Sequence, residues 1–355
     1  MKTWIYILLL FPAPALFAQG IALEEMPFEE ALRQAGEQKK LLFVDFYTGW
    51  CMPCREMARR LESEQAAAGF FNPRFVTVKY DLERGEGKIL RDRFNVTGIP
   101  SYFIFAPDGV ELYRRVGALP LEQFIERIAA GADPRNAINT MEKEWSEGNA
   151  TRERTMNYLN FLIEAGRVEQ SIQVAAALLD KLTDEEKLSP LYWPAFRDRY
   201  ITPSASPNML FLLEYLDRFR ENVPAREIDK KIEENFYPLN GFLAGHEVEG
   251  GLPLLDALQE IIRLYDLPDK ARLDAKARLA RAFVNRDVEE ITALLERHLP
   301  GETLAPWQCE KALELVAARG DNAARSRLAR LAKQLSKDAG ESRREQINRL
   351  FREFL

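Results

Sequence analysis

The segment Val44-Asp45-Phe46-Tyr47-Thr48-Gly49-Trp50-Cys51-Met52-Pro53-Cys54 decides the fold of the N-terminal third of the chain. It overlaps an apolar run over residues 41–47, which has the length and composition of a buried strand. Two cysteines three residues apart follow, and then a stretch with helical spacing. Such a pair can be a redox dithiol or half of a zinc site. Because the chain has only three cysteines and two histidines, no second pair completes a zinc site, and the dithiol interpretation is favoured.

Strand-like and helix-like patterns alternate on both sides of this segment. We expect an amphipathic helix over residues 28–35 and a second strand over 75–80. Residues 81–88 form a charged, glycine-containing stretch, and a loop or a short helix is expected between the second strand and the hairpin. Pro107-Asp108-Gly109 is typical of the turn of a hairpin, here between strands at 101–105 and 110–115, and a closing helix is expected over 121–130. This order predicts a βαβ unit joined to an antiparallel pair, and therefore an α/β fold with a mixed sheet flanked by helices.

Three segments together resemble the thioredoxin superfamily. The stretch from Val44 to Cys54 resembles its active-site segment, and Val96-Thr97-Gly98-Ile99-Pro100-Ser101 resembles the loop whose cis-proline faces the disulfide. Val116-Gly117-Ala118-Leu119 resembles the glycine-bearing turn that ends the sheet. The segments lie in the family's order, and the resemblance covers residues 24–131. It implies a thioredoxin fold for that part and thiol:disulfide oxidoreductase activity.

The roles of the two neighbouring cysteines follow from helix electrostatics. A cysteine in the first turn of a helix lies beside unpaired backbone N–H groups and the positive end of the helix dipole, so its thiolate is stabilised and its pKa falls. We therefore expect Cys51 to be the nucleophile, and Cys54, one turn further on, to be the resolving thiol that attacks a mixed disulfide. Met52 and Pro53 lie between them and are candidate substrate-binding residues. Such dithiol exchange requires no bound cofactor and no metal.

The resemblance implies supporting roles for further residues. Trp50 resembles the tryptophan that shields the thiols, with a simple packing aromatic as the alternative. Asp45 resembles the family's buried carboxylate, which acts as a base toward Cys54, with a fold-stabilising hydrogen bond as the alternative. Pro100, if cis, would hold the Ile99 backbone so that a substrate strand pairs beside the disulfide.

One departure from the family's pattern concerns the partner of Asp45. Many thioredoxins carry a lysine near the buried acid on the following strand, and Thr77 stands in that place here. Lys79 lies two residues further along, on the same face of the predicted strand, and is the candidate to take the place of that lysine beside Asp45.

Residues 1–18 have the parts of a secretory signal peptide. Lys2 provides a positive charge, residues 5–10 a short apolar run, and Ala18 a small residue before Gln19. We expect cleavage after Ala18 and export, to the periplasm or an equivalent compartment. An uncleaved N-terminal anchor is the alternative, which the two prolines in the apolar stretch, Pro12 and Pro14, disfavour.

From Asp133 onward the patterns are helical almost throughout. The expected organisation is a signal peptide over residues 1–18, a thioredoxin-like domain over 19–132 and an α-helical domain over 133–355. Apolar residues around Ala165-Gly166-Arg167 resemble a single tetratricopeptide-like hairpin, but no clean period continues downstream. Four prolines between Ser189 and Pro207 predict a break between helical groups. Cys309, on a later helix, is expected to be a buried inert thiol.

Composition limits the partners of the protein. Its 355 residues carry 49 Lys plus Arg against 55 Asp plus Glu, a net charge of −6, and so lack the basic excess typical of nucleic-acid binding. We expect protein thiols and disulfides as substrates, an upstream redox partner, and a client or a second copy of the chain bound by the helical domain. The sequence thus predicts an exported thiol:disulfide oxidoreductase. The alternative is a helical partner-binding or assembly protein whose thioredoxin domain is mainly structural.

Overall fold

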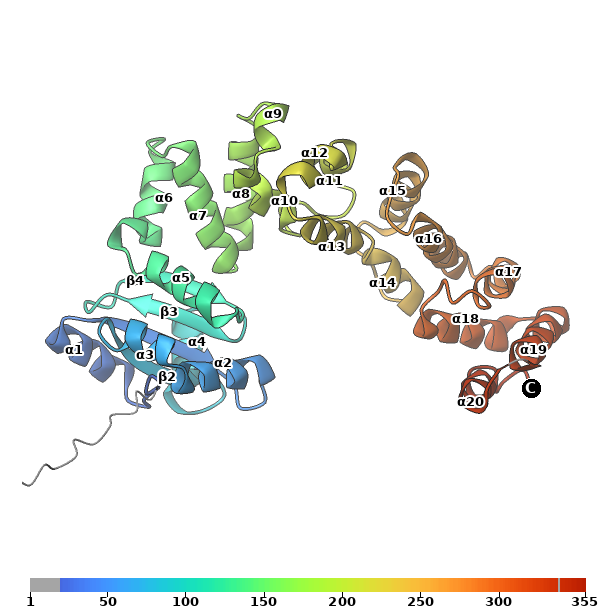
Figure 1. The fold of residues 1–355 in the computed structure, drawn as a ribbon, viewed down its shortest axis with the longest axis horizontal. Coiled ribbons are helices and arrows are strands. Elements are labelled where there is room, and N and C mark those ends of the chain that lie inside the picture. Colours follow the sequence, from blue (N-terminus) through green and yellow to red (C-terminus); the bar gives the residue numbers. More distant parts are fainter. Residues whose placement is uncertain (1–19, 338) are drawn as a thin grey trace, which may run out of the picture. The chain divides into compact units, whose positions relative to one another are not determined.

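The computed structural model describes residues 20–337 and 339–355 (Figure 1). The expected signal peptide and its cleavage site lie outside the described residues. The chain divides into two compact units, one ending at Lys181 and the other spanning Leu182–Leu355. Within the described ranges, no helix is both long and apolar enough to cross a membrane.

The first unit is built on a four-stranded mixed sheet with the strand order β2-β1-β3-β4. The central strand β1 (Leu41–Tyr47) lies parallel to β2 (Phe75–Asp81) and antiparallel to β3 (Ser101–Phe105), which pairs in turn with β4 (Glu111–Val116). The segment before the first helix adds a bridge along β2, between Glu24 and Val78. The mixed sheet expected from the sequence is therefore confirmed.

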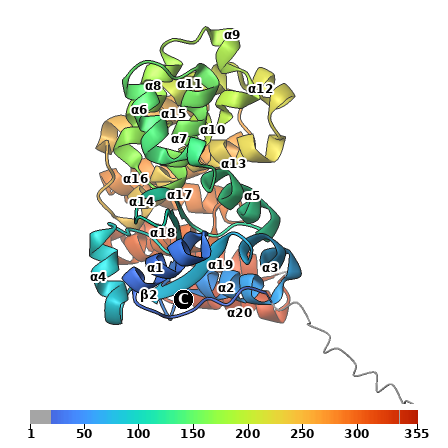
Figure 2. The same ribbon diagram turned by 90° about the vertical axis from the view of Figure 1, so that its left-hand side faces the viewer.

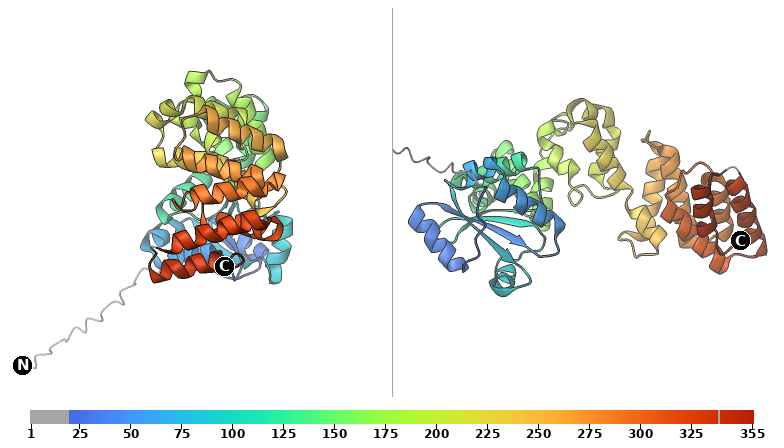
Figure 3. Two further views of the ribbon diagram at one scale, coloured as in Figure 1. Left: turned by 90° about the vertical axis from the view of Figure 1, so that its right-hand side faces the viewer. Right: turned by 60° about the horizontal axis from the view of Figure 1, so that its bottom comes forward.

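Alternation along the strands gives this sheet two apolar faces covered by different helices (Figure 3). Leu42, Val44 and Phe46 point to the face that carries α1 (Phe28–Gln38) and α4 (Gly85–Arg93). Phe43 points to the other face, where its ring lies 4.9 Å from Phe71 of α3 (Gln65–Phe71) and 6.3 Å from Phe124 of α5 (Leu121–Gly131). The helix that follows Cys51, α2 (Met52–Ser63), contacts α3 and α5. Asp45 therefore shares the face of Phe43 and of the cysteine-bearing helix.

The element between β2 and the hairpin is the helix of the two alternatives. A charged loop or a short helix was expected from residue 81 onward, and α4 begins at Gly85. The charged and glycine-rich composition left both alternatives open, because the buried side of the helix is small and centres on Gly87 and Leu90. A Cβ at Gly87 would lie 2.0 Å from the carbonyl oxygen of Asp81, so only glycine allows this close approach of the helix to the end of β2.

Three helices beyond the expected domain boundary belong to the first unit: α6 (Ile138–Ser146), α7 (Arg152–Glu164) and α8 (Val168–Leu179). They lie side by side next to α5 and β4 (Figures 1 and 2). Both α6 and α7 contact β4. Since β4 is an edge strand, they cover backbone groups that could otherwise pair with another chain.

The carboxylate of Glu164 in α7 binds this helix to side chains of β4 and α5. Glu164 accepts a hydrogen bond from the hydroxyl of Tyr113 at 2.5 Å, and it pairs with Arg115 at 3.3 Å and Arg127 at 2.6 Å. The side chains of Glu164 and Arg115 are only 16% and 12% exposed, so water screens this cluster less than a surface ion pair.

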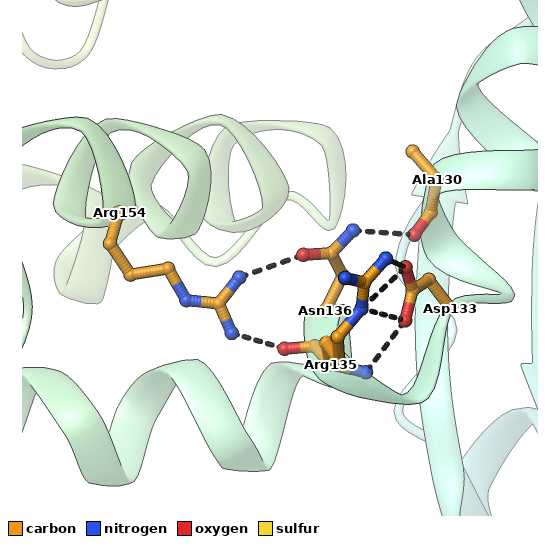
Figure 4. Close-up of polar contacts among 5 residues, drawn as sticks. All are labelled: Ala130, Asp133, Arg135, Asn136 and Arg154. Carbon is orange, nitrogen blue, oxygen red and sulfur yellow. Dashed lines mark hydrogen bonds and ion pairs between the residues drawn. The ribbon is translucent and has the colours of Figure 1, made fainter.

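The connector between α5 and α6 is also held by specific contacts (Figure 4). It contains a short 3-10 helix, η1 (Pro134–Asn136), which Asp133 caps by accepting from the backbone N–H of Arg135 at 2.9 Å. Asn136 donates to the carbonyl of Ala130 at 3.1 Å, and Arg154 of α7 donates to the side-chain oxygen of Asn136 at 2.7 Å and to the carbonyl of Arg135. The chain at the expected domain boundary is therefore hydrogen-bonded to α5 on one side and to α7 on the other.

The second unit consists of helices, which confirms the expected all-α region. Its last five helices pack in sequence, each against the next (Figure 3). The elements of this unit are α9 (Asp184–Lys187), η2 (Pro190–Tyr192), α10 (Trp193–Arg197), α11 (Pro207–Glu214), α12 (Leu216–Asn222), α13 (Ala225–Asn235), α14 (Pro238–Ala244), α15 (Gly251–Leu264), α16 (Lys270–Asn285), α17 (Val288–His298), α18 (Pro306–Arg319), α19 (Asn322–Lys337) and α20 (Glu341–Leu350).

These contacts predict that the helices up to Lys181 stabilise the sheet. A fragment ending after Lys181 should unfold at a higher urea concentration than one ending after Ala132, because the shorter fragment exposes β4 and leaves Arg115 and Arg127 without Glu164. Glu164→Ala in the longer fragment should lower the free energy of unfolding by about 2–4 kcal/mol. Glu126→Ala, which removes an exposed carboxylate from α5, is the control and should change it by less than about 0.5 kcal/mol. Equal midpoints for the two fragments would contradict this interpretation.

Candidate active site

The two neighbouring cysteines form a disulfide at the start of α2. Cys51 is the N-cap residue of this helix, and its sulfur accepts a hydrogen bond from the backbone N–H of Cys54 at 3.2 Å. The Cys51–Cys54 bond joins Cα atoms 5.3 Å apart. On reduction, the same N–H and the positive end of the helix would stabilise a thiolate at Cys51. Pro53 occupies the first turn of the helix, where its missing N–H is not needed.

A buried carboxyl group lies on the β1 strand that leads to this disulfide. Asp45 is 1% exposed, and its Oδ1 atom has no hydrogen-bond partner among the described residues. Burial raises its pKa from 3.8 to about 7, against the attraction of Lys79. Lys79 stands directly opposite Asp45 in the β1–β2 register, and it pairs with Glu62 of α2 at 3.5 Å. Asp45 is therefore a group that can take or release a proton near neutral pH.

The register also identifies the neighbours of this carboxyl group. Thr77 is opposite Phe43 rather than Asp45, and its hydroxyl donates to the carbonyl of Ala22 at 2.6 Å. On the other side, Tyr102 of β3 is opposite Asp45, and its buried hydroxyl lacks a hydrogen-bond partner within the described ranges. Lys79, not Thr77, is thus the residue across from the acid. Tyr102 was not among the site residues expected from the sequence.

Trp50 is held in place by a residue that the sequence analysis missed. Its indole N–H donates to a carboxylate oxygen of Glu83 at 3.0 Å, while 67% of its surface remains exposed. The Glu83 backbone N–H is in turn fixed by the side chain of Asp81 at 2.9 Å. Trp50 and Glu83 follow the carboxyl ends of the parallel strands β1 and β2, which meet at one edge of the sheet. The sequence could have indicated this pair, because Trp50 and Glu83 each follow a predicted strand closely and the two strands end at the same edge of the sheet.

The proline loop enters the sheet at the same end. The Ile99–Pro100 peptide bond is cis, and the register pairs the next residue, Ser101, with Phe46 near the end of β1. The loop is braced by Gly117, whose backbone N–H donates to the carbonyl of Pro100 at 2.8 Å. Gly117 has a φ of +92°, a conformation that favours glycine. The second and third motifs of the sequence analysis are therefore physically joined.

The residues expected to bind substrate are apolar and differ in exposure from the two cysteines. Met52 is 70% exposed, Pro53 is exposed and Ile99 is half-buried, whereas Cys51 and Cys54 are buried. The assignment of Met52, Pro53 and Ile99 to substrate binding stays a prediction. Cys309 is buried in α18, and burial raises the pKa of its thiol to about 11.

Comparison with known proteins identifies thioredoxin-like relatives of the part of the chain that carries the disulfide. A family model described as thioredoxin-like matches residues 24–107. The chain is 32% identical over 127 residues to the chloroplastic thioredoxin-like protein HCF164 of Oryza sativa subsp. japonica, a match that covers 34% of this chain and 45% of the relative. It is 36% identical over 107 residues to thioredoxin H-type 1 of Nicotiana tabacum, which covers 30% of this chain and 79% of the relative. The match thus spans less than half of the first relative's length.

Among solved structures, a Bacteroides thetaiotaomicron protein assigned as a disulphide-isomerase is 36% identical to this chain. The match covers 32% of this chain and 95% of that chain, and its TM-score is 0.31. The sequence matches define the class of protein to which the redox site belongs. The chain belongs to the thioredoxin superfamily through its N-terminal part.

The buried acid makes stability depend on pH in a direction that can be tested. Because the pKa of Asp45 is higher in the folded protein, the folded state binds more protons than the unfolded state between about pH 4 and 7. The contribution of Asp45 to the free energy of unfolding should therefore fall as pH rises through this window. Asp45→Asn should remove that fall and stabilise the oxidised protein at pH 8 by on the order of 4 kcal/mol.

Urea unfolding of both proteins at pH 5 and pH 8 measures the effect. Glu126→Gln, which changes an exposed carboxylate, is the control and should follow the wild-type profile. If Asp45→Asn kept the wild-type pH dependence, Asp45 would not be the titrating group.

Proposed function

We propose that this protein is an exported thiol:disulfide oxidoreductase that reduces or exchanges disulfides in other proteins. The observation that carries the proposal is the position of Cys51, at the N-cap of α2 with Cys54 one turn further along and a buried carboxyl group on the preceding strand. Helix dipole and backbone N–H stabilise the attacking thiolate, and Asp45 has a pKa suited to proton transfer near pH 7.

In the reducing direction, two electrons pass from the dithiol to the substrate. The Cys51 thiolate attacks one sulfur of a substrate disulfide, forming a mixed disulfide and releasing the other sulfur as a thiolate that takes up a proton. Asp45 then accepts the Cys54 proton, and the Cys54 thiolate attacks the sulfur of Cys51. This step forms the Cys51–Cys54 disulfide and releases the second substrate thiolate. An upstream dithiol must then reduce the protein again.

The surface around the disulfide is suited to extended polypeptides. The backbone of Ile99, held by the adjoining Pro100, would pair with a substrate strand. Exposed Met52 and Trp50 would contribute apolar contacts beside the reacting sulfurs. Glu83 would act as a positioning residue for Trp50 through the hydrogen bond to its indole.

Export is supported by residues 1–18, with a charged start, a short apolar run and Ala18 before Gln19. The direct test is the N-terminal sequence of the protein recovered from its native host after fractionation. Export predicts a protein in the exported fraction that begins at Gln19. Recovery in the cytosol with Met1 retained would contradict it.

The cysteine roles predict distinct phenotypes. Alkylation of reduced protein should modify Cys51 first, at a pH well below the ordinary thiol pKa of about 8.5. Cys51→Ser should abolish reduction of insulin disulfides, whereas Cys54→Ser should accumulate mixed disulfides at Cys51. Asp45→Asn should slow the release of such mixed disulfides at pH 7 by about ten-fold or more, without changing the first attack by as much.

Cys309→Ser is the matched control, because it removes a buried thiol distant in sequence from the pair, and it should leave the activity unchanged. A Cys51 that titrates like a free cysteine would contradict the assignment of the nucleophile. The reduction potential of the pair fixes the direction of the reaction. A value near −270 mV, roughly that of thioredoxin, favours a reductase, and a value near about −120 mV favours an oxidase.

A further inference from the structure

A cavity of about 380 Å³ lies within the second unit. It is bounded by α13, α14, α16, α18, the segment that joins α17 to α18, and α20. The apolar part of its wall is buried and is formed by Phe236, Leu273 and Leu304. A volume of this size is within the range that accommodates small organic molecules.

One wall of the cavity presents hydrogen-bond donors without acceptors. Lys276 of α16 is half-buried, and its ammonium makes neither a hydrogen bond nor an ion pair with any residue that the structure describes. Asn240 also lines the cavity, and its side-chain oxygen accepts from Gln308 at 3.5 Å, which leaves its amide N–H groups free to donate. Both residues are half-buried, so a ligand that brings acceptors would pair with donors that are partly withdrawn from water.

The charged groups around Lys276 leave its charge poorly compensated. Burial and the nearby guanidinium of Arg272 lower its pKa to about 8, and Glu233 opposes this shift without forming an ion pair within 4 Å. The other lining carboxylate, Glu302, is engaged by Arg343. Arg272 pairs with Asp269 at 3.2 Å. Lys276 is thus the cation of the cavity that has no anionic partner of its own in the described chain.

We propose that this cavity binds a small carboxylic acid with an apolar body, with the carboxylate against Lys276 and the body against the wall formed by Phe236, Leu273 and Leu304. A single unpaired ammonium with an amide donor on the same cavity fits one carboxylate better than the two charges of a phosphate monoester. The C-terminal residue of a polypeptide has the same chemistry as a free acid.

Titration of the full chain with 3-phenylpropanoate, followed by calorimetry, tests the proposal. The acid should bind at least about ten-fold more tightly than 3-phenylpropanamide, because the amide lacks the charge that pairs with Lys276. Lys276→Met should weaken binding of the acid by at least about ten-fold. Lys333→Met, which removes an exposed lysine of α19 that does not line the cavity, should leave binding unchanged.

A second measurement reads Lys276 directly. At pH 8, bound acid should protect Lys276 from acetylation, measured by mass spectrometry, while Lys333 should be modified equally with and without the acid. Since Lys276→Met removes a partly desolvated charge, it should fold, and circular dichroism verifies this. The acetylation readout uses the wild-type chain and does not depend on that variant.

Two further probes distinguish the source of the carboxylate. N-acetyl-Ala-Ala-Phe with a free C-terminus, compared with its C-terminal amide, tests a polypeptide end. Tight binding of the peptide acid assigns the cavity to a chain terminus, and tight binding of 3-phenylpropanoate alone assigns it to a free acid. The proposal is overturned if none of these acids binds, if each amide binds as well as its acid, or if Lys276 is not protected. Cys51→Ser should bind like wild type, so the result is independent of the redox function.

Discussion

The burial of one carboxyl group, at Asp45, is the constraint on which the redox end of the molecule depends. Strand β1 has to bring this polar side chain into the interior and, six residues later, place Cys51 at the start of α2. Because strand side chains alternate, a shift of β1 by one residue would exchange Asp45 with the apolar residues of the opposite face. The neighbouring Phe43 and Phe46 oppose such a shift, since both are fully buried on their own faces. The aromatic packing of the sheet therefore sets the position of the acid relative to the disulfide.

The covered edge of the sheet explains why the first unit extends beyond the thioredoxin-like elements. Strand β4 ends the sheet, and α6 and α7 lie against it. Glu164 forms ion pairs with two arginines there and accepts a hydrogen bond from Tyr113. Its removal would leave these partly buried polar groups without that partner. The thioredoxin-like family model matches only residues 24–107. The contacts that stabilise this particular chain continue to Lys181.

Local patterns allowed the strands, the cysteine pair and the helical character of the remaining chain to be predicted. Strand β1 has the predicted bounds because its apolar run is interrupted only by Asp45 and ends at a turn. A loop and a short helix both stayed open for the α4 segment, because glycines and charges dominate the first turns of this helix. Glu83 and Glu164 were missed for another reason: Glu83 is 33 residues from Trp50, and Glu164 is 51 residues from Tyr113. Their roles arise when the chain folds and carry no periodic signal in the sequence.

Two lysines of the second unit show how the surroundings separate a structural cation from one suited to a ligand. Lys231 is 3% exposed, and its ammonium donates to the carbonyls of Thr202 at 2.6 Å and Asp198 at 3.4 Å. Burial lowers the pKa of both Lys231 and Lys276 to about 8, so titration alone does not distinguish them. Lys231 already has its acceptors, and they hold the segment between α10 and α11 against α13. Lys276 borders a cavity and has no such acceptor in the described chain, so the free energy gained by pairing it is still available to an incoming carboxylate.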